Sequence, residues 1–425
     1  MHQVFPSILD NDVYKFTMQN AVFTHYKRDI PVVYQFTNRQ KALSLNIEAV
    51  EWLQKQIDGN TFFKKNVGNT MLDLEYVTLT KEEGVYLSSI PYLEEKYIEY
   101  LSNYRFRPKE QVHISYDKDT QDLTLEVSGT WLETILYEVP LLALISESFF
   151  RFVDKDWNYE GQVEQAAQKT RTLLDHDCGF AEFGTRRRRD FKTQDLVVRT
   201  MHETFEEYKK ECEKDGKKNR GAFTGTSNMY LAMKYQLNAV GTVAHEFFMA
   251  ISALESVQHA NRESLKIWHS VYRGKLGIAL TDTFTTAVFL KDFQHELATT
   301  YDGVRHDSGD PFRFADTMVD HYKSLGIDPS TKVIVFSDSL TVDLAIRLQK
   351  HSDQLGIKSN FGIGTSLTND FKKASDSTVK SKALNIVIKI KECQGKRVIK
   401  LSDDPSKHSA DNAAVSAFQR ELGIQ

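Results

Sequence analysis

The sequence predicts an α/β fold in which parallel strands and helices alternate in a barrel-like arrangement. Short apolar segments recur between residues 239 and 363, and a helical pattern of hydrophobic residues follows each one. Right-handed crossovers between such units form a barrel or an open parallel sheet. Each segment also ends in polar residues, at the strand ends where both architectures place their functional groups. The predicted strands are Ala239–Val243, Gly277–Leu280, Gly303–Val304, Val333–Phe336 and Phe361–Ile363.

The first third of the chain has a different pattern, which predicts an α+β domain over residues 1–140. Residues 32–37 and 123–128 alternate between apolar and polar side chains, as half-exposed strands do. A helix with one apolar face follows Asn46, and residues 61–107 are expected to be helical in pieces. The combination predicts an antiparallel sheet with helices packed against it.

The end of the chain is expected to leave the barrel. The barrel is assigned to residues 141–383, after which Leu384–Ile390 and Val398–Leu401 predict a hairpin around a Gln-Gly turn. Residues 403–425 are expected to form a tail whose main element is a closing helix over residues 411–422.

Composition narrows the class of protein. The 425 residues include 58 acidic and 54 basic side chains, so the formal net charge is −4. This balance argues against a general nucleic-acid or membrane-surface protein, whose affinity comes from a positive field. The three cysteines have no metal-ligand or disulfide-framework spacing and fit a reducing compartment. With no apolar signal segment and no membrane-length apolar run, a cytoplasmic location is expected, with the nucleus also open.

Four consecutive arginines, Arg186 to Arg189, allow two interpretations. Such a run is found in nucleic-acid and nuclear-import segments, but the acidic composition and the following Asp190 weigh against that. The alternative is that some of them hold a carboxylate or phosphate, since guanidinium pairs with both in two contacts. On a helix, two of the four would face outwards as ordinary surface. The charged residues 209–220 that follow are expected to form a loop or lid.

The polar strand ends suggest the chemistry. His245 follows the first predicted strand, where it is either a core histidine, a base or a covalent acceptor. Arg305 beside Asp307 offers a cation for an anion, and carboxylates for hydroxyls or Mg²⁺. Residues 362–366 form a Gly-Ile-Gly-Thr-Ser turn that either cradles a phosphate or is merely tight. No HExxH, GxSxG or Walker A sequence is present, so we expect a barrel enzyme that handles a phosphorylated, anionic substrate.

Nine stretches together give the chain a close resemblance to the nicotinate phosphoribosyltransferase family. They are spread over nearly the whole chain in the family's order, which makes the set specific although each alone is weak. The stretches are DVYKFTM (12–18), EFGTRRRR (182–189), GTSN (225–228), GTVAHE (241–246), ALTDTF (279–284), VRHDSGDP (304–311), SDSL (337–340), FGIGT (361–365) and LNIVIK (384–389).

The resemblance implies a phosphoribosyltransferase barrel and a reaction. Nicotinate would attack C1 of phosphoribosyl pyrophosphate, giving nicotinate mononucleotide and pyrophosphate in NAD salvage, with ATP as co-substrate and Mg²⁺ as cofactor. His245 matches the histidine that ATP phosphorylates, and Asp282 matches the carboxylate that orients its imidazole. Glu246, the next residue, is a further catalytic candidate. A nucleophilic ring nitrogen works best when the other nitrogen is held in one tautomer.

The resemblance also implies binding roles. Tyr14, Thr242 and Arg305 would surround nicotinate, with Arg187 a second candidate for its carboxylate. The phosphoribosyl pyrophosphate would meet a set of residues at the strand ends, and catalysis would be positioning plus charge stabilisation. That set is Arg39, Lys41, Asp307 for the ribose hydroxyls, Asp338, and Gly364 with Thr365 for the 5′-phosphate. In the family, Tyr14 and Arg39 would come from a partner subunit, so a homodimer with shared active sites is implied. The hairpin after the barrel would return to the N-terminal domain and make that domain discontinuous.

Ser227 distinguishes the nearest alternative. Relatives that use nicotinamide place an aspartate at this position to accept the amide N–H, whereas a serine can donate to the carboxylate of nicotinate. His306 follows Arg305 where family members vary, and it is given no role. The alternatives are a nicotinamide phosphoribosyltransferase, a non-enzymatic binding protein on the same fold, and a nucleic-acid binder that uses the arginine run.

Overall fold

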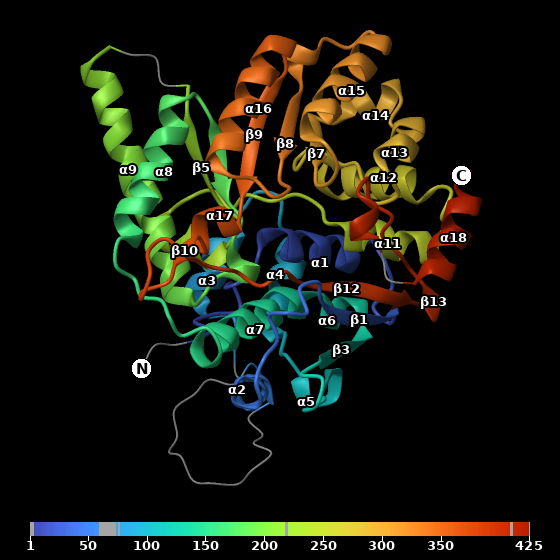
Figure 1. Cartoon of the computed structure of the whole chain (residues 1–425). Coiled ribbons are helices and arrows are strands. Elements are labelled where there is room, and N and C mark those ends of the chain that lie inside the picture. The colour runs from blue at the N-terminus through green and yellow to red at the C-terminus, as the bar shows by residue number, and fades with distance from the viewer. Residues whose placement is uncertain (1–3, 59–73, 75–76, 217–219, 409–410, 425) are drawn as a thin grey trace.

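The computed structural model describes residues 4–58, 74, 77–216, 220–408 and 411–424. Figure 1 shows two layers of the molecule: a parallel sheet with its helices above, and an antiparallel sheet with α2 to α7 below. One large hydrophobic core runs through both, from Phe5 to Val398. Residues 61–73 of the predicted helical stretch 61–107 lie outside the described residues, as do residues 217–219 of the predicted loop 209–220.

The lower layer is the predicted α+β domain. Two strands from late in the chain, β12 and β13, complete its sheet. Its antiparallel sheet has the order β13-β12-β1-β3-β2, so the late strand β12 lies beside the early strand β1. In β1, Val32, Tyr34 and Phe36 are buried, which confirms the alternation seen in the sequence. The expected boundary at residue 140 falls inside the continuous helix α7, which packs against α2 and β12. The elements are α1 (Val13–His25), β1 (Pro31–Asn38), α2 (Ile47–Asp58), α3 (Lys81–Ser88), α4 (Glu95–Asn103), α5 (Pro108–Gln111), β2 (Val112–Tyr116), β3 (Leu123–Thr130), α6 (Trp131–Thr134), α7 (Glu138–Phe152), β12 (Ile386–Cys393) and β13 (Lys396–Arg397).

The upper layer is the barrel-like domain. Its six parallel strands have the order β5-β4-β9-β8-β7-β6, and β5 and β6 are not paired with each other among the described residues. The elements are α8 (Gln162–Asp175), β4 (Gly179–Glu182), α9 (Phe191–Lys214), β5 (Ala222–Thr226), α10 (Met229–Tyr235), α11 (His245–Leu254), α12 (Ala260–Tyr272), β6 (Ile278–Leu280), α13 (Thr286–Asp292), α14 (His295–Thr300), β7 (Gly303–His306), α15 (Pro311–Ser324), β8 (Val333–Phe336), α16 (Val342–Leu355), β9 (Lys358–Ile363) and α17 (Thr365–Thr368).

Two elements predicted from the sequence differ in the structure. The predicted strand 239–243 makes only one isolated bridge, from Ala239 to Thr226, because the start of α1 packs directly against it. A Cβ on Gly241 would lie 2.2 Å from Cγ1 of Val13. The expected loop over residues 209–220 is helical to Lys214, as the end of α9.

The hairpin is also shorter than the sequence suggested. It turns where expected, at Gln394 and Gly395, which both have positive φ, but its second strand is Lys396–Arg397. The following residues 398–408 leave the sheet and run to the barrel, where they contact the functional site. The closing helix α18 (Asn412–Glu421) forms as predicted, and the side chain of Asp411 caps its first turn.

Candidate functional site

His245 lies at the centre of a charged cluster where the ends of β6 and β7 meet the first turn of α11. Its Nε2 is 2.8 Å from Oδ2 of Asp307 and 2.7 Å from Nζ of Lys400. Its Nδ1 is 3.0 Å from Oγ1 of Thr283. We call His245, Asp282, Asp307 and Lys400 the catalytic cluster. Both ring nitrogens therefore have hydrogen-bond partners, which fixes the orientation of the ring.

Burial and the charge of Lys400 keep this imidazole neutral. Burial and the ammonium of Lys400 lower the pKa of His245 to about 4, against the opposing effect of the carboxylates. Burial alone would raise the pKa of Asp307, but Lys400 and the hydrogen bond from His245 hold it well below its usual range. At neutral pH the ring therefore keeps a lone pair, which a nucleophile requires.

Asp307, and not Asp282, has the contact with the imidazole that the resemblance assigned to Asp282. Asp282 is 3.7 Å from Nε2 of His245 and makes no hydrogen bond to it. Its Oδ2 accepts from Oγ of Ser308 at 2.5 Å and pairs with Lys400 at 3.2 Å, while its buried Oδ1 has no hydrogen-bond partner. Asp307, expected to hold the ribose hydroxyls, is the carboxylate that is hydrogen-bonded to the imidazole.

Glu246 does not face the site, although the sequence made it a catalytic candidate. It points from α11 into the core, where it forms an ion pair with the fully buried Lys15. Its Oε1 accepts from the hydroxyl of Tyr34 at 2.6 Å and from Nε1 of Trp131 at 2.8 Å. Because adjacent helical residues point in different directions, His245 and Glu246 belong to different networks.

Thr242 and Arg305 come together as the resemblance implied. Nη1 of Arg305 donates to Oγ1 of Thr242 at 3.3 Å and to the carbonyl of Val243 at 3.2 Å. Nε of Arg305 is buried without a partner. A donor pair of this kind can bind a carboxylate.

Tyr14 lies on the other side of the same segment, in the first turn of α1. Gly241 packs against its backbone, and the guanidinium of Arg186 lies 5.9 Å from the centre of its ring. The arginine beside Tyr14 is thus Arg186, which the sequence did not single out. Arg187 instead donates to the carbonyl of Ile386 at 3.2 Å and 3.3 Å.

Ser227 is held by a neighbouring acid. Its hydroxyl donates to Oδ1 of Asp12 at 2.7 Å, and burial raises the pKa of that carboxyl. Arg186 also lies near Asp12, with an Nε–Oδ2 distance of 3.9 Å. A carboxylate therefore lies close to the proposed base site even though residue 227 is a serine.

Tyr14 and Arg39 both lie near the proposed site of their own chain, and their contribution to the site of a partner subunit stays a prediction. Arg39 follows β1, and its backbone N–H donates to the carbonyl of Asn385 at 2.9 Å. Burial lowers the pKa of Arg39, and the charges of Asp307 and Asp338 oppose that shift. The pairing of β1 with β12 brings this strand end to the barrel.

Three lysines from the end of the chain enter the site, and sequence reasoning assigned none of them. Lys400 lies in the catalytic cluster, and Lys407 pairs with Asp338 at 2.5 Å. Nζ of Lys389 donates to the carbonyl of Lys407 at 3.2 Å. Burial, together with Arg39 and Lys400, lowers the pKa of Lys389 to about 7. Lysines within the apolar runs IVIKIK and RVIKL were the available signal, because buried lysines are rare without a partner or a function.

The predicted phosphate turn is compact. A Cβ on Gly364 would lie 2.8 Å from the carbonyl oxygen of Phe183, so the turns after β4 and β9 touch there. Thr365 begins the short helix α17 and lines a cavity of about 670 Å³. A glycine is required at this contact because any side chain would separate the two turns.

The last two arginines of the run, Arg188 and Arg189, are held by partners within the fold. Arg188 forms two contacts of 2.6 Å with Asp10, and Arg189 lies between the rings of Phe150 and Phe371, each 4.0 Å away. Both arginines are buried, so the expectation that two of the four face solvent is wrong for them.

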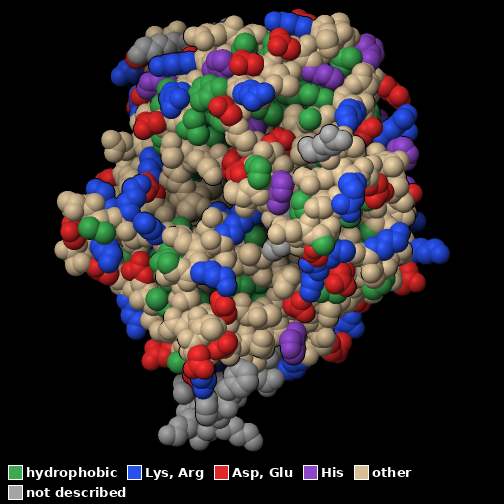
Figure 2. Space-filling model, turned by 45° about the vertical axis from the view of Figure 1, so that its right-hand side comes forward, with side chains coloured by type: hydrophobic (Ala, Val, Ile, Leu, Met, Phe, Trp, Pro, Cys, Tyr) green, Lys and Arg blue, Asp and Glu red, His purple; other side chains and the backbone are tan. Residues whose placement is uncertain are grey.

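Lys41, expected to meet a phosphate, instead pairs with Asp122 at 3.3 Å on the surface. On the face shown in Figure 2, basic and acidic side chains are interspersed, which does not favour the nucleic-acid interpretation.

Comparison with known proteins decides the family. The family model of the nicotinate phosphoribosyltransferase family matches residues 178–425, and the model of its N-terminal domain matches residues 9–146. The chain belongs to the nicotinate phosphoribosyltransferase family.

Its relatives match over almost the full length. A Schizosaccharomyces pombe relative is 45% identical, with 98% of this chain and 97% of the relative covered. The nicotinate phosphoribosyltransferase of Methanosarcina acetivorans is 41% identical, with 98% of each chain covered. A crystal structure from Saccharomyces cerevisiae, 40% identical, superimposes with a TM-score of 0.90 and full coverage of both chains. The barrel and the discontinuous N-terminal domain are thus those of the nicotinate phosphoribosyltransferase family.

The family implies Mg²⁺, which the donor set fits only in part. His245, Asp282 and Asp307 offer ligand atoms within 4.8 Å of one another, but Lys400 lies among them and already supplies the positive charge. Mg²⁺ in such enzymes is usually held by substrate phosphates as well as protein oxygens. The geometry therefore favours an ion carried by the diphosphate, where it would neutralise charge, over a site built from protein ligands.

His306 is buried between the rings of Phe314 and Phe336, and neither ring nitrogen has a hydrogen-bond partner. No helix among the described residues has the length and apolar content needed to cross a bilayer.

Proposed function

We propose that this chain transfers the phosphoribosyl group of 5-phosphoribosyl 1-pyrophosphate to nicotinate. The pyridine nitrogen forms a bond to C1 of the ribose as the C1–O bond to pyrophosphate breaks, giving nicotinate mononucleotide and pyrophosphate. The observation that carries this proposal is the pairing of Arg305 with Thr242, next to Tyr14 and close to the catalytic cluster. It supplies donors for a carboxylate and a ring for stacking on a chain of this family.

The charges of the site suit the second substrate. Arg39, Lys389, Lys400 and Lys407 approach the site from β1 and from the end of the chain, and their positive charge matches a diphosphate. The Gly364–Thr365 turn is assigned to the 5′-phosphate, and Asp307 with Asp338 to the ribose side. This reaction needs little proton transfer, so positioning and charge stabilisation carry the catalysis.

ATP coupling through His245 is the second part of the proposal. A ring nitrogen of the neutral imidazole attacks the γ-phosphorus of ATP, the bond to the bridging oxygen breaks, and ADP leaves. Water later hydrolyses the phosphohistidine to inorganic phosphate. The low pKa of His245 and its fixed ring support this role, and Lys400 offers a charge for the bound phosphoryl group.

A coupled assay tests both parts. The purified protein is incubated with phosphoribosyl pyrophosphate, Mg²⁺ and either nicotinate or nicotinamide, each with and without ATP. Nucleotide formed from nicotinate, with ADP released alongside, is the expected result. Transfer without any ADP would remove the coupling and keep the transferase. No product from either base would favour a binding protein on the same fold.

One observation favours nicotinamide as a second candidate substrate. Asp12 accepts the hydroxyl of Ser227 and lies near Arg186, so a carboxylate is available to an amide N–H. Product from nicotinamide in preference to nicotinate would establish this candidate.

The predicted homodimer and the cytoplasmic location stay predictions. Light scattering of the purified chain measures its oligomeric state.

A further inference from the structure

Glu182, the last residue of β4, places a carboxyl group where three neighbouring parallel strands end. β4 pairs with β5 on one side and with β9 on the other. The side chain of Glu182 is fully buried. Glutamate is rarely buried to this extent unless it has partners, so the contacts of this carboxyl group indicate its role.

Three donors from three segments converge on the carboxylate of Glu182. The hydroxyl of Thr226, at the end of β5, donates to Oε2 at 2.6 Å. Nε2 of Gln194, on α9, lies 3.0 Å and 3.2 Å from the two carboxylate oxygens, and the backbone N–H of Gly184 donates to Oε1. Burial raises the pKa of Glu182 to about 7, and these three hydrogen bonds oppose that shift. The ionised form therefore connects the turns that follow β4 and β5.

These two turns carry groups that lie next to the proposed base site. The turn Thr185–Arg187 places the guanidinium of Arg186 5.9 Å from the centre of the ring of Tyr14. The turn after β5 carries Ser227, whose backbone N–H donates to the carbonyl of Glu182 at 2.8 Å. Both turns therefore take their positions from the end of β4.

The same hydrogen-bond network continues to the segment before α1. Oε1 of Gln194 accepts from Nη1 of Arg188 at 2.9 Å, and Arg188 pairs with Asp10. Nδ2 of Asn228 also donates to Asp10, at 2.7 Å. Asp10 lies two residues before Asp12, the acid beside the base site. A buried polar network with its members hydrogen-bonded in this way fixes the segments that it connects.

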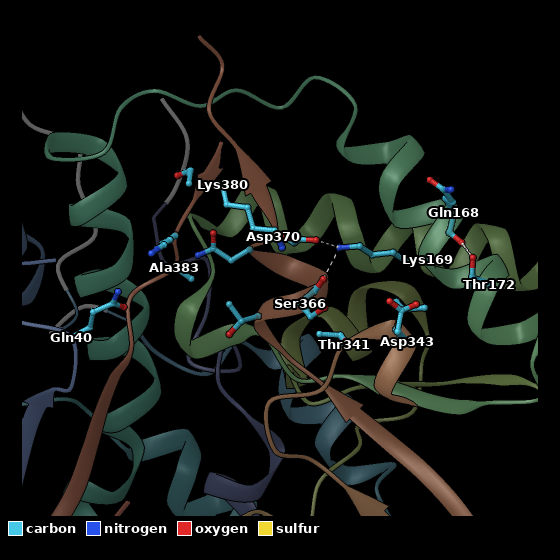
Figure 3. A pocket seen from close by; sticks show the side chains of 15 residues that line it. Gln40, Gln168, Lys169, Thr172, Thr341, Asp343, Ser366, Asp370, Lys380 and Ala383 are labelled. Atoms are coloured by element: carbon cyan, nitrogen blue, oxygen red, sulfur yellow. Dashed lines mark hydrogen bonds and ion pairs between the residues drawn. The ribbon is translucent and has the colours of Figure 1, made fainter. Parts of the chain in front are cut away.

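The proposed phosphate turn has an anchor of its own. Nζ of Lys169, on α8, donates to the carbonyl of Ser366 at 2.6 Å and pairs with Asp370 at 2.7 Å, as Figure 3 shows. Lys380 pairs with the other oxygen of Asp370 at 3.2 Å. The phosphate side of the site is thus held from α8, whereas the base side is held by Glu182.

We propose that Glu182 is a positioning residue for nicotinate. From within the core, its carboxylate fixes Arg186 and Ser227 relative to each other and so sets the affinity for the base. This inference rests on the transfer reaction proposed above and names a residue that positions the substrate of that reaction. A glutamine at this position would turn one acceptor into an N–H donor that faces other donors, so the two turns would separate.

Steady-state kinetics of Glu182→Gln at pH 8, where the wild-type carboxyl group is ionised, test the proposal. The KM for nicotinate should rise about tenfold, because one buried hydrogen bond is replaced by an unpaired donor. The KM for phosphoribosyl pyrophosphate should change by less than about threefold, because Lys169 still holds the phosphate turn. Thr226→Val removes one hydroxyl from the network and should raise the KM for nicotinate about threefold.

Glu147→Gln is the matched control. Glu147 is also a buried carboxyl group with a pKa that burial raises to about 7, but its carboxylate pairs with Arg151 on α7. This variant should lower the melting temperature and leave both KM values unchanged. Glu182→Gln combined with Gln194→Glu returns a carboxylate to the network and should restore most of the affinity for nicotinate.

An unchanged KM for nicotinate in Glu182→Gln, or an equal rise of both KM values, overturns the inference. A rise of the nicotinate KM in Glu147→Gln, or no recovery in the exchanged pair, also overturns it. Calorimetric titration with nicotinate measures binding of the base without turnover. A wild-type protein that binds nicotinate but forms no nucleotide would contradict the proposed function and still allow this test. Circular dichroism establishes that each variant is folded, and Thr226→Val replaces Glu182→Gln in the comparison if the latter does not fold.

Discussion

Two adjacent residues, His245 and Glu246, begin the same helix and belong to opposite kinds of charged cluster. His245 lies in the catalytic cluster, where Asp307 and Lys400 both approach the same ring nitrogen. Glu246 lies in a buried ion-pair cluster with Lys15 and Glu138, in which Lys15 is completely buried and contacts both acids. A group that can react and a group that stabilises the fold are thus consecutive residues of one helix.

The difference lies in how completely the polar atoms are satisfied. In the buried ion-pair cluster, Tyr34 and Trp131 saturate the carboxylate of Glu246. In the catalytic cluster, Oδ1 of Asp282 has no hydrogen-bond partner, and two groups of opposite charge compete for Nε2 of His245. Polar atoms without a full set of hydrogen bonds lower the stability of the fold, and they remain available to bind a substrate.

The largest expected effect is on stability, from Lys15→Met. Removing the ammonium leaves the carboxylates of Glu138 and Glu246 buried without their cation, which costs about 3–5 kcal/mol of unfolding free energy. Urea denaturation measures the change. Lys41→Met is the control, because Lys41 and Asp122 form an exposed pair worth about 0–1 kcal/mol. Equal losses in the two variants would contradict the structural role given to the buried ion-pair cluster.

Arg305→Ala should show the opposite behaviour, a loss of activity with little loss of stability. Without the guanidinium, the carboxylate of nicotinate loses a charge-assisted contact, so kcat/KM for nicotinate falls about 100-fold, or about 2.7 kcal/mol. Steady-state kinetics with nicotinate and with nicotinamide measure the effect. If both bases lose activity equally, Arg305 does not bind the carboxylate.

The charge of Lys389 should make substrate binding at the site depend on pH. Its pKa of about 7 means that the free site loses this positive charge as the pH rises above 7. Because a diphosphate binds the ammonium form, the KM for phosphoribosyl pyrophosphate should rise from pH 7 to pH 8.5, by up to about tenfold per pH unit. Lys389→Arg stays charged throughout and should remove the slope. The same slope in this variant would exclude Lys389 as its source.

The smallest expected effect concerns the choice of base. Ser227→Asp adds a second carboxylate next to Asp12, so it should disfavour nicotinate relative to nicotinamide by about tenfold, or about 1.4 kcal/mol. The ratio of kcat/KM for the two bases measures the preference. Ser227→Asn is the control of similar size without the charge. An unchanged ratio would mean that residue 227 does not read the substrate carboxylate.

Much of the fold was predictable because hydrophobic periodicity records it locally. Strands β6 to β9 and helix α18 are close to their predicted positions, since each is short, apolar and bounded by polar residues. The segment 239–243 has the same apolar pattern but lies against α1, and that contact is a tertiary choice that the local sequence does not record.

The site was predictable where motifs carry it and not where distant segments meet. The motif residues Thr242, His245, Arg305 and Asp307 come together as expected. Lys400 arrives from a segment more than 90 residues after Asp307, because β12 returns to β1 and directs residues 398–408 toward the barrel. The direction of Glu246 depended on its buried partner Lys15, which lies 231 residues earlier in the chain.

The most direct test of the contrast between the two clusters compares His245→Gln with Glu246→Gln in one preparation series. ATP-stimulated transfer to nicotinate and the melting temperature are measured for both. We expect His245→Gln to keep its melting temperature and to lose all stimulation by ATP, leaving slow ATP-independent transfer. We expect Glu246→Gln to melt several degrees lower and to keep the stimulation. ATP stimulation that survives in His245→Gln, or disappears in Glu246→Gln, would contradict the different roles of the two residues.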